Sequence, residues 1–192
     1  MGMPHDAMSQ LGFLPYVATW LPEEVTWYSA GAYSSDPSLV HPLPWMHLDY
    51  AYWFPRPYNA YAPHSVIAFD ETAQPHDLTA NIYVPSQMLR ITSKTPVDIN
   101  GHAATLFEVQ SSGASGSSAK NAVHVIGVEW QEGALWVRVT AVTSGHYFPE
   151  SIGEGGEGED VAAWEGTSTD VLLRVARSAR AYTGCDKNTF GG

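Results

Sequence analysis

The sequence has little cysteine, little positive charge and no long apolar run, and each shortage excludes a class of protein. Cys185 is the single cysteine among 192 residues, so no disulfide can form within the chain. No apolar stretch approaches the ~18 residues that a membrane-spanning helix needs. Nine Lys and Arg stand against 20 Asp and Glu, and the formal net charge of −11 repels nucleic acid and anionic lipid. We therefore expect no nucleic-acid partner and no membrane span.

Familiar catalytic and targeting motifs are also missing. The sequence contains no Gly-x-Ser-x-Gly elbow and no H-x-x-x-H, C-x-x-C or H-E-x-x-H spacing. Residues 1–10 lack the basic and apolar regions of a signal peptide. These absences favour a non-catalytic role and leave the location of the protein open at this point.

The composition indicates a globular chain. Hydrophobic residues make up 44% of the sequence and charged residues 15%, which is enough to bury a core. We predict a single domain over residues 1–192, with a flexible Ser/Gly linker at 111–118 and an acidic, Gly-rich loop at 150–166. Calcium binding by that loop is less favoured, because alternating Asp or Asn ligands are absent.

Two hairpins are predicted in the second half of the chain. Asn100-Gly101 is typical of a type I′ turn and would pair Val97 with Ala104. A second hairpin joins 122–130 to 135–142, with Glu132-Gly133 as the loop in the tightest register. That register places Trp130 opposite Leu135, Val128 opposite Val137 and Ile126 opposite Val139, with Glu129 diagonal to Arg138.

The first half predicts further strands, and the end of the chain predicts a helix. Candidate strands are 25–33, 47–54, 65–69 and 88–92. The helix begins at a cap, Thr167 or Ser168, and Gly184 is the candidate C′ residue. Its apolar stripe contains Val171, Leu172, Val175, Ala179 and Tyr182. We therefore predict an α+β, mostly β fold: a curved antiparallel sheet built from hairpins, with a covering C-terminal helix.

Four stretches carry a family resemblance in their order along the chain: Leu14 to Val25, Val97 to Glu108, Val128 to Gly133 and Val171 to Ala176, 36 of the 192 residues in all. They resemble an extracytoplasmic bacterial domain of unknown function that is found fused to anti-sigma factors. The resemblance implies a mostly β sensor or binding domain outside the cytoplasm, similar to sigma-regulator and lipoprotein-carrier folds. It implies no catalytic residue and no cofactor.

An aromatic block over residues 45–61 is the least ordinary feature of the sequence. Rings with polar tips can form a platform for sugars or apolar ligands, and an Arg can stack on such a ring. Leu48, Tyr50, Tyr52 and Phe54 alternate with His47, Asp49, Ala51 and Trp53, so one face of this strand is also a candidate for the core. The candidate ligand-binding residues are Trp45, Trp53, Arg56, Tyr58 and Tyr61.

Histidines and carboxylates concentrated between residues 41 and 77 leave a metal site as an alternative. His47 and Asp49 share a strand face, and a neighbouring strand could bring His64 alongside. The candidate ligands are His47, Asp49, His64 and His76.

The leading hypothesis is a non-catalytic, extracytoplasmic or secreted domain that binds or senses a small molecule, a glycan or a protein. The alternatives are a small metal-dependent enzyme that uses the His/Asp cluster, and a structural subunit that assembles through its aromatic segment.

Overall fold

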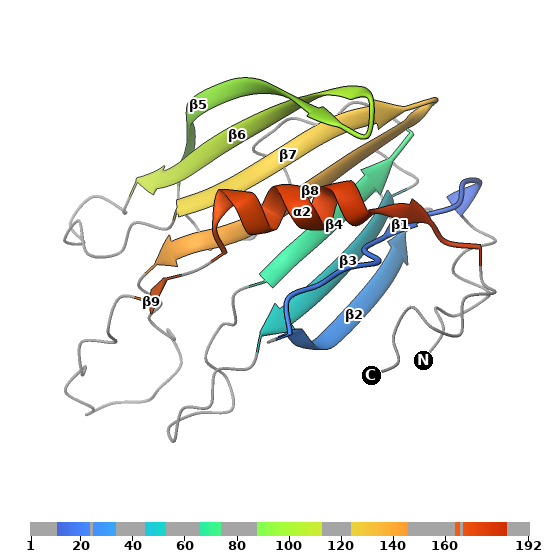
Figure 1. Cartoon of the computed structure of the whole chain (residues 1–192), viewed down its shortest axis with the longest axis horizontal. Coiled ribbons are helices and arrows are strands. Elements are labelled where there is room, and N and C mark those ends of the chain that lie inside the picture. Colours follow the sequence, from blue (N-terminus) through green and yellow to red (C-terminus); the bar gives the residue numbers. More distant parts are fainter. Residues whose placement is uncertain are drawn as a thin grey trace.

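The computed structural model describes residues 11–23, 25–33, 45–52, 66–73, 88–112, 124–145, 164–165 and 167–183. These residues form ten strands and one helix, shown in Figure 1. In chain order the elements are β1 (Tyr16–Val17), β2 (Val25–Tyr33), β3 (Trp45–Tyr52), β4 (Val66–Thr72), β5 (Met88–Ile99), β6 (His102–Ser112), β7 (His124–Glu132), β8 (Leu135–Gly145), β9 (Trp164–Glu165), α2 (Thr169–Ser178) and β10 (Arg180–Ala181).

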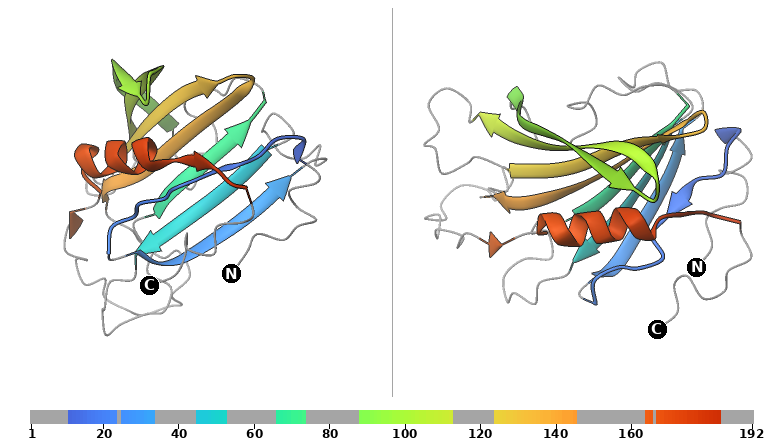
Figure 2. Two further views of the ribbon diagram at one scale, coloured as in Figure 1. Left: turned by 45° about the vertical axis from the view of Figure 1, so that its right-hand side comes forward. Right: turned by 45° about the horizontal axis from the view of Figure 1, so that its top comes forward.

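A curved antiparallel sheet dominates the molecule, as predicted. Seven of its eight strands follow the order β2-β3-β4-β8-β7-β6-β5, and the eighth, β9, pairs with β8 beside this path. Figure 2 shows the curvature, with α2 lying across one face of the sheet. The predicted fold class, a mostly β sheet with a helix near the C-terminus, is therefore confirmed. No helix in the described part of the chain is long and apolar enough to cross a membrane.

The hairpin at Asn100-Gly101 forms in the predicted register. Val97 pairs with Ala104, and both turn residues have positive φ, 56° for Asn100 and 88° for Gly101. Positive φ at both central positions is what a type I′ turn requires, and Asn and Gly adopt it at the lowest cost. The turn also contacts α2, because the Asn100 side chain donates a hydrogen bond of 2.9 Å to the Arg177 carbonyl.

The second hairpin forms, but its predicted register was wrong by two residues. Glu132 pairs with Leu135, and Trp130 pairs with Val137, so the loop is Gly133-Ala134. Gly133 has a φ of 63°, which fits a turn with glycine at the first of its two central positions. A shift of two residues keeps every side chain on its predicted face, because the period of a strand is two. It changes the partners, and Glu129 lies directly opposite Arg138 rather than diagonal to it.

Helix α2 begins as predicted and ends earlier than predicted. The Ser168 hydroxyl caps it by accepting a hydrogen bond from the Val171 N–H, and Leu172, Val175 and Ala176 are buried. The prediction that Gly184 follows the helix was wrong. The chain becomes extended at Ala179 (φ −60°, ψ 136°) and enters β10, so Tyr182 lies beyond the helix.

Other predicted boundaries need smaller corrections. Strand β2 has the predicted bounds, whereas β3 begins two residues early, at Trp45. Ser111 and Ser112 belong to β6 rather than to the linker, and Trp164–Glu165 form β9 inside the predicted acidic loop. The remainder of both segments, 113–118 and most of 150–166, lies outside the described residues. The single domain over 1–192 stays a prediction.

The two faces of the sheet are both buried over much of their area. On the face under α2, a row of directly paired residues, Leu48, Phe69, Val139 and Val128, contributes to the apolar core. Residues from the N-terminal segment and from α2 complete that core; they include Leu11, Val17, Ala18, Leu172, Val175 and Ala176. The opposite face contains the candidate functional site.

Candidate functional site

Four polar residues form a row across four neighbouring strands, on the face of the sheet opposite α2. His47 in β3 pairs with Asp70 in β4, Asp70 pairs with Arg138 in β8, and Arg138 pairs with Glu129 in β7. We call these four residues the polar row. Directly opposed residues in an antiparallel sheet point to the same face, with Cβ atoms about 4.5–5.5 Å apart. The strand register therefore brings together residues that are up to 91 positions apart in the sequence, from His47 to Arg138.

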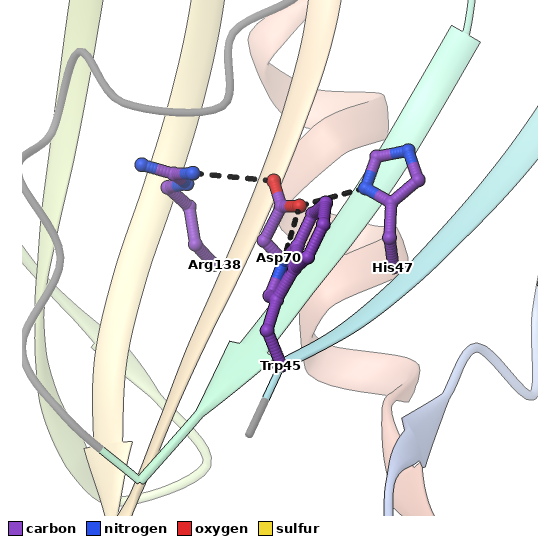
Figure 3. A network of polar contacts seen from close by, with 4 residues as sticks. All are labelled: Trp45, His47, Asp70 and Arg138. Atoms are coloured by element: carbon purple, nitrogen blue, oxygen red, sulfur yellow. Dashed lines mark hydrogen bonds and ion pairs between the residues drawn. The ribbon is translucent and has the colours of Figure 1, made fainter. Parts of the chain in front are cut away.

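Asp70 is the centre of this row, and three side chains donate to its carboxylate (Figure 3). Oδ1 lies 2.7 Å from His47 Nδ1 and accepts a hydrogen bond of 3.2 Å from Trp45 Nε1. Oδ2 accepts a hydrogen bond of 3.2 Å from Arg138 Nη2. Asp70 and Arg138 are both 0% exposed, so this ion pair is shielded from solvent. The contacts link β3, β4 and β8 through one carboxylate.

The surroundings of Asp70 keep it ionised. Burial by itself would raise the pKa of the carboxyl, but the hydrogen bond from His47 and the positive charge of Arg138 outweigh it, and the pKa lies below its ordinary value. An ionised carboxylate can only accept hydrogen bonds, so His47 Nδ1 carries the proton in this contact. In the neutral imidazole, Nε2 is then the nitrogen with the lone pair.

This arrangement has two possible chemical uses. A carboxylate on one ring nitrogen fixes the orientation of a histidine and raises the basicity of the other nitrogen, which then can accept a proton or bind a metal. The His47 side chain is 24% exposed, so it is the partly accessible member of the Asp70 contacts. The second use is structural, because a buried carboxylate that holds three strands fixes their relative positions.

Glu71, the next residue in β4, faces the opposite way and is also fully buried. Both of its carboxyl oxygens lie within hydrogen-bond distance of the Tyr16 backbone N–H, at 3.0 and 2.8 Å. Burial raises the pKa of Glu71 well above its ordinary value, although the Tyr16 N–H lowers it and nearby Asp70 raises it further. The contact holds the N-terminal segment on the face that α2 covers, where Tyr16–Val17 pairs with Arg180–Ala181.

The structure places only part of the predicted metal site. His47 lies opposite Asp70, while Asp49 lies two positions further along β3. His64 and His76 are outside the described residues. Within the ranges that the structure describes, no group of three or more His, Cys, Asp or Glu side chains is arranged to hold a metal ion.

Of the five predicted ligand-binding residues, the structure describes one, Trp45. Trp45 begins β3 and is 7% exposed, with its indole N–H on Asp70. Its ring lies 5.5 Å from the His47 ring at an interplanar angle of 46°. Trp53, Arg56, Tyr58 and Tyr61 lie outside the described residues. The described part of β3 ends at Tyr52, about 23 Å along the strand from Trp45.

The sequence interpretation missed the central role of Asp70. The predicted strand ended at Phe69, so neither Asp70 nor Glu71 was assigned to a face of the sheet. A signal was present, since two consecutive carboxylates inside a strand must point to opposite faces. If both faces are covered, both carboxylates are buried and need partners.

Comparison with protein-family models, with curated proteins and with solved structures finds no match to this chain.

Proposed function

We propose that this chain is a non-catalytic binding or sensing domain that works outside the cytoplasm. Its ligand is recognised by the aromatic segment that follows β3, residues 53–61. The ligand classes that fit aromatic rings with polar tips are sugars and apolar molecules.

The anchoring of β3 is the observation that carries this proposal. Trp45 and His47 are tied to Asp70, which is tied to Arg138, while Met46 and Leu48 are buried in the core. Binding residues commonly lie on loops that a rigid scaffold positions. The aromatic segment continues directly from such a strand, which favours recognition over packing as the role of its rings.

The fold supports the extracytoplasmic part of the proposal less directly. The resemblance described above implies a mostly β sensor or binding domain, and the curved antiparallel sheet with a helix near the C-terminus agrees with the mostly β part of that expectation.

A metal-dependent enzyme is the second candidate, and one observation favours it. The contact between His47 and Asp70 is the carboxylate–histidine arrangement that orients metal-binding and proton-transferring histidines. Elemental analysis of protein purified without added metal separates the two candidates. A stoichiometric bound transition metal supports the enzyme, whereas a metal-free protein that still binds a ligand supports the binding domain.

The binding proposal is tested with two probes of the favoured ligand classes, Nile red for apolar ligands and a glycan array for sugars. We expect the wild-type chain to bind one of them and Trp53→Ala to weaken that binding at least about tenfold, or ~1.4 kcal/mol. Trp136→Ala is the matched control, because Trp136 is a half-buried tryptophan of β8. Failure of both probes, or equal losses in the two variants, would contradict the proposal.

Stability measurements keep the test specific. If Tyr52 shares the face of buried Leu48, as the alternation predicts, Tyr52→Ala should cost the ~3–5 kcal/mol typical of truncating a buried aromatic, and Trp53→Ala clearly less. A larger loss for Trp53→Ala than for Tyr52→Ala would mean that Trp53, and not Tyr52, shares the face of Leu48.

A further inference from the structure

The two outer strands of the sheet differ in how they are protected against pairing with another chain. Strand β5 carries Lys94 and Pro96, and its pairing with β6 is interrupted by a register shift between Ile91 and Ser93. Lysine, proline and bulges are the devices by which natural sheets prevent pairing along an edge. We therefore do not expect β5 to extend the sheet.

Strand β2 has none of these devices beyond its first residues. Its nine residues, VTWYSAGAY, include no charged residue and no proline. Its register with β3 shifts only between Val25 and Trp27 and then runs without interruption to Tyr33. Among the described residues, β3 is the strand that pairs with β2, so β2 is an outer strand of the described sheet, with one side on which none of these residues pairs.

Two copies of β2 fit each other when they run antiparallel with Ser29 of one copy opposite Ser29 of the other. In that antiparallel register, Trp27 stands opposite Gly31 and Tyr28 stands opposite Ala30, so these two large residues each meet a small one, while Tyr33 at the end of the strand meets Val25. An aromatic residue across from a strand glycine is a known stabilising combination. The absence of charge in β2 also matters, because two chains of net charge −11 can meet there without opposing like charges directly.

We propose that β2 pairs with β2 of a second copy of this chain, antiparallel and across a twofold axis at Ser29. The partner is a second copy because complementarity about one residue is a property of an isologous contact, in which the same patch serves on both sides. The pairing would join the two sheets into one continuous sheet. The proposed contact is made by β2 and not by residues 53–61, so it differs from assembly through the aromatic segment.

Charge reversal at the proposed axis tests this contact. Ser29→Lys places two lysines directly opposite each other, and Ser29→Glu places two glutamates there. We expect the wild-type chain to sediment as a dimer, each variant alone as a monomer with half that mass, and a mixture of the two variants again as a dimer. Thr95→Lys, on the protected edge strand β5, is the control that should stay dimeric.

A disulfide tests the register independently and does not depend on how well the charged variants fold. In a Cys185→Ser background, Ser29→Cys brings two cysteines within the Cα separation of 4.4–6.8 Å that a disulfide spans. Ala32→Cys is the matched control, because its two copies would be about 20 Å apart in the same register. We expect mild oxidation to give a covalent dimer with Ser29→Cys only.

Three results would overturn the proposal. They are a wild-type chain that stays monomeric over a wide range of concentration, a dimer that Ser29→Lys and Ser29→Glu leave intact, and equal crosslinking of Ser29→Cys and Ala32→Cys. A monomer that binds an added extended peptide along β2 would also count against it, since the occupant would then be another protein.

Discussion

Replacing Asp70 with Asn removes one charge from the buried centre of the polar row while keeping the size of the side chain. The variant retains one oxygen that can accept a hydrogen bond, but it offers no negative charge to Arg138, which is 0% exposed. Removing one partner of a buried ion pair costs about 3–5 kcal/mol, and because Glu129 lies directly opposite Arg138 we expect the lower end of that range. Domains of this kind have total stabilities of about 5–15 kcal/mol, so the loss is a large fraction of the whole.

Urea denaturation of wild type and Asp70→Asn at neutral pH measures this loss. Asp98→Asn is the matched control, because Asp98 is exposed and its side chain accepts a hydrogen bond of 3.0 Å from the Gly101 N–H, which an Asn oxygen can also accept. Arg138→Met combined with Asp70→Asn removes both charges, and we expect the double variant to be more stable than the sum of the single losses predicts. Similar losses for Asp70→Asn and Asp98→Asn would refute the reasoning.

Three further predictions follow from single positions. Gly127→Ala should lower the free energy of unfolding by about 1–3 kcal/mol, because a Cβ there overlaps the buried Phe107 ring; unchanged urea midpoints would contradict this. Gly101→Val should lower the melting temperature, since a β-branched residue is strained at a φ of 88°, and an unchanged thermal transition would count against the type I′ turn. Glu71 has a raised pKa in the folded state, so its contribution to stability is complete below its ordinary pKa of 4.5 and is lost as pH rises through the folded pKa. Glu71→Gln should therefore make the free energy of unfolding fall less steeply as pH rises above 4.5. An identical pH profile in the two proteins would argue against a buried, protonated Glu71.

Local signals predicted the hairpins and the start of the helix because each depends on a few neighbouring residues. Asn100-Gly101 fixes its turn through backbone conformation alone, and Ser168 caps α2 through one hydroxyl. The second hairpin shows where such signals fail. Glu132-Gly133 and Gly133-Ala134 are both acceptable loops with the same faces, and only the packing of the complete sheet chooses between them.

The polar row could not be predicted because it depends on the order of strands that are distant in sequence. His47, Asp70 and Arg138 meet only because β4 lies between β3 and β8, and no pattern within any one strand specifies that order. The metal hypothesis placed His47 and Asp49 on one strand face and allowed a neighbouring strand to bring His64 alongside. The register instead places Asp70 opposite His47.

Affinity for the probe that the wild-type chain binds, measured after exhaustive treatment with a chelator, tests the central claim most directly. A non-catalytic binding domain that uses residues 53–61 should keep its Kd after chelation, and Trp53→Ala should raise that Kd at least about tenfold. If chelation abolishes binding and a divalent metal restores it, or if Trp53→Ala leaves the Kd unchanged, the account is contradicted.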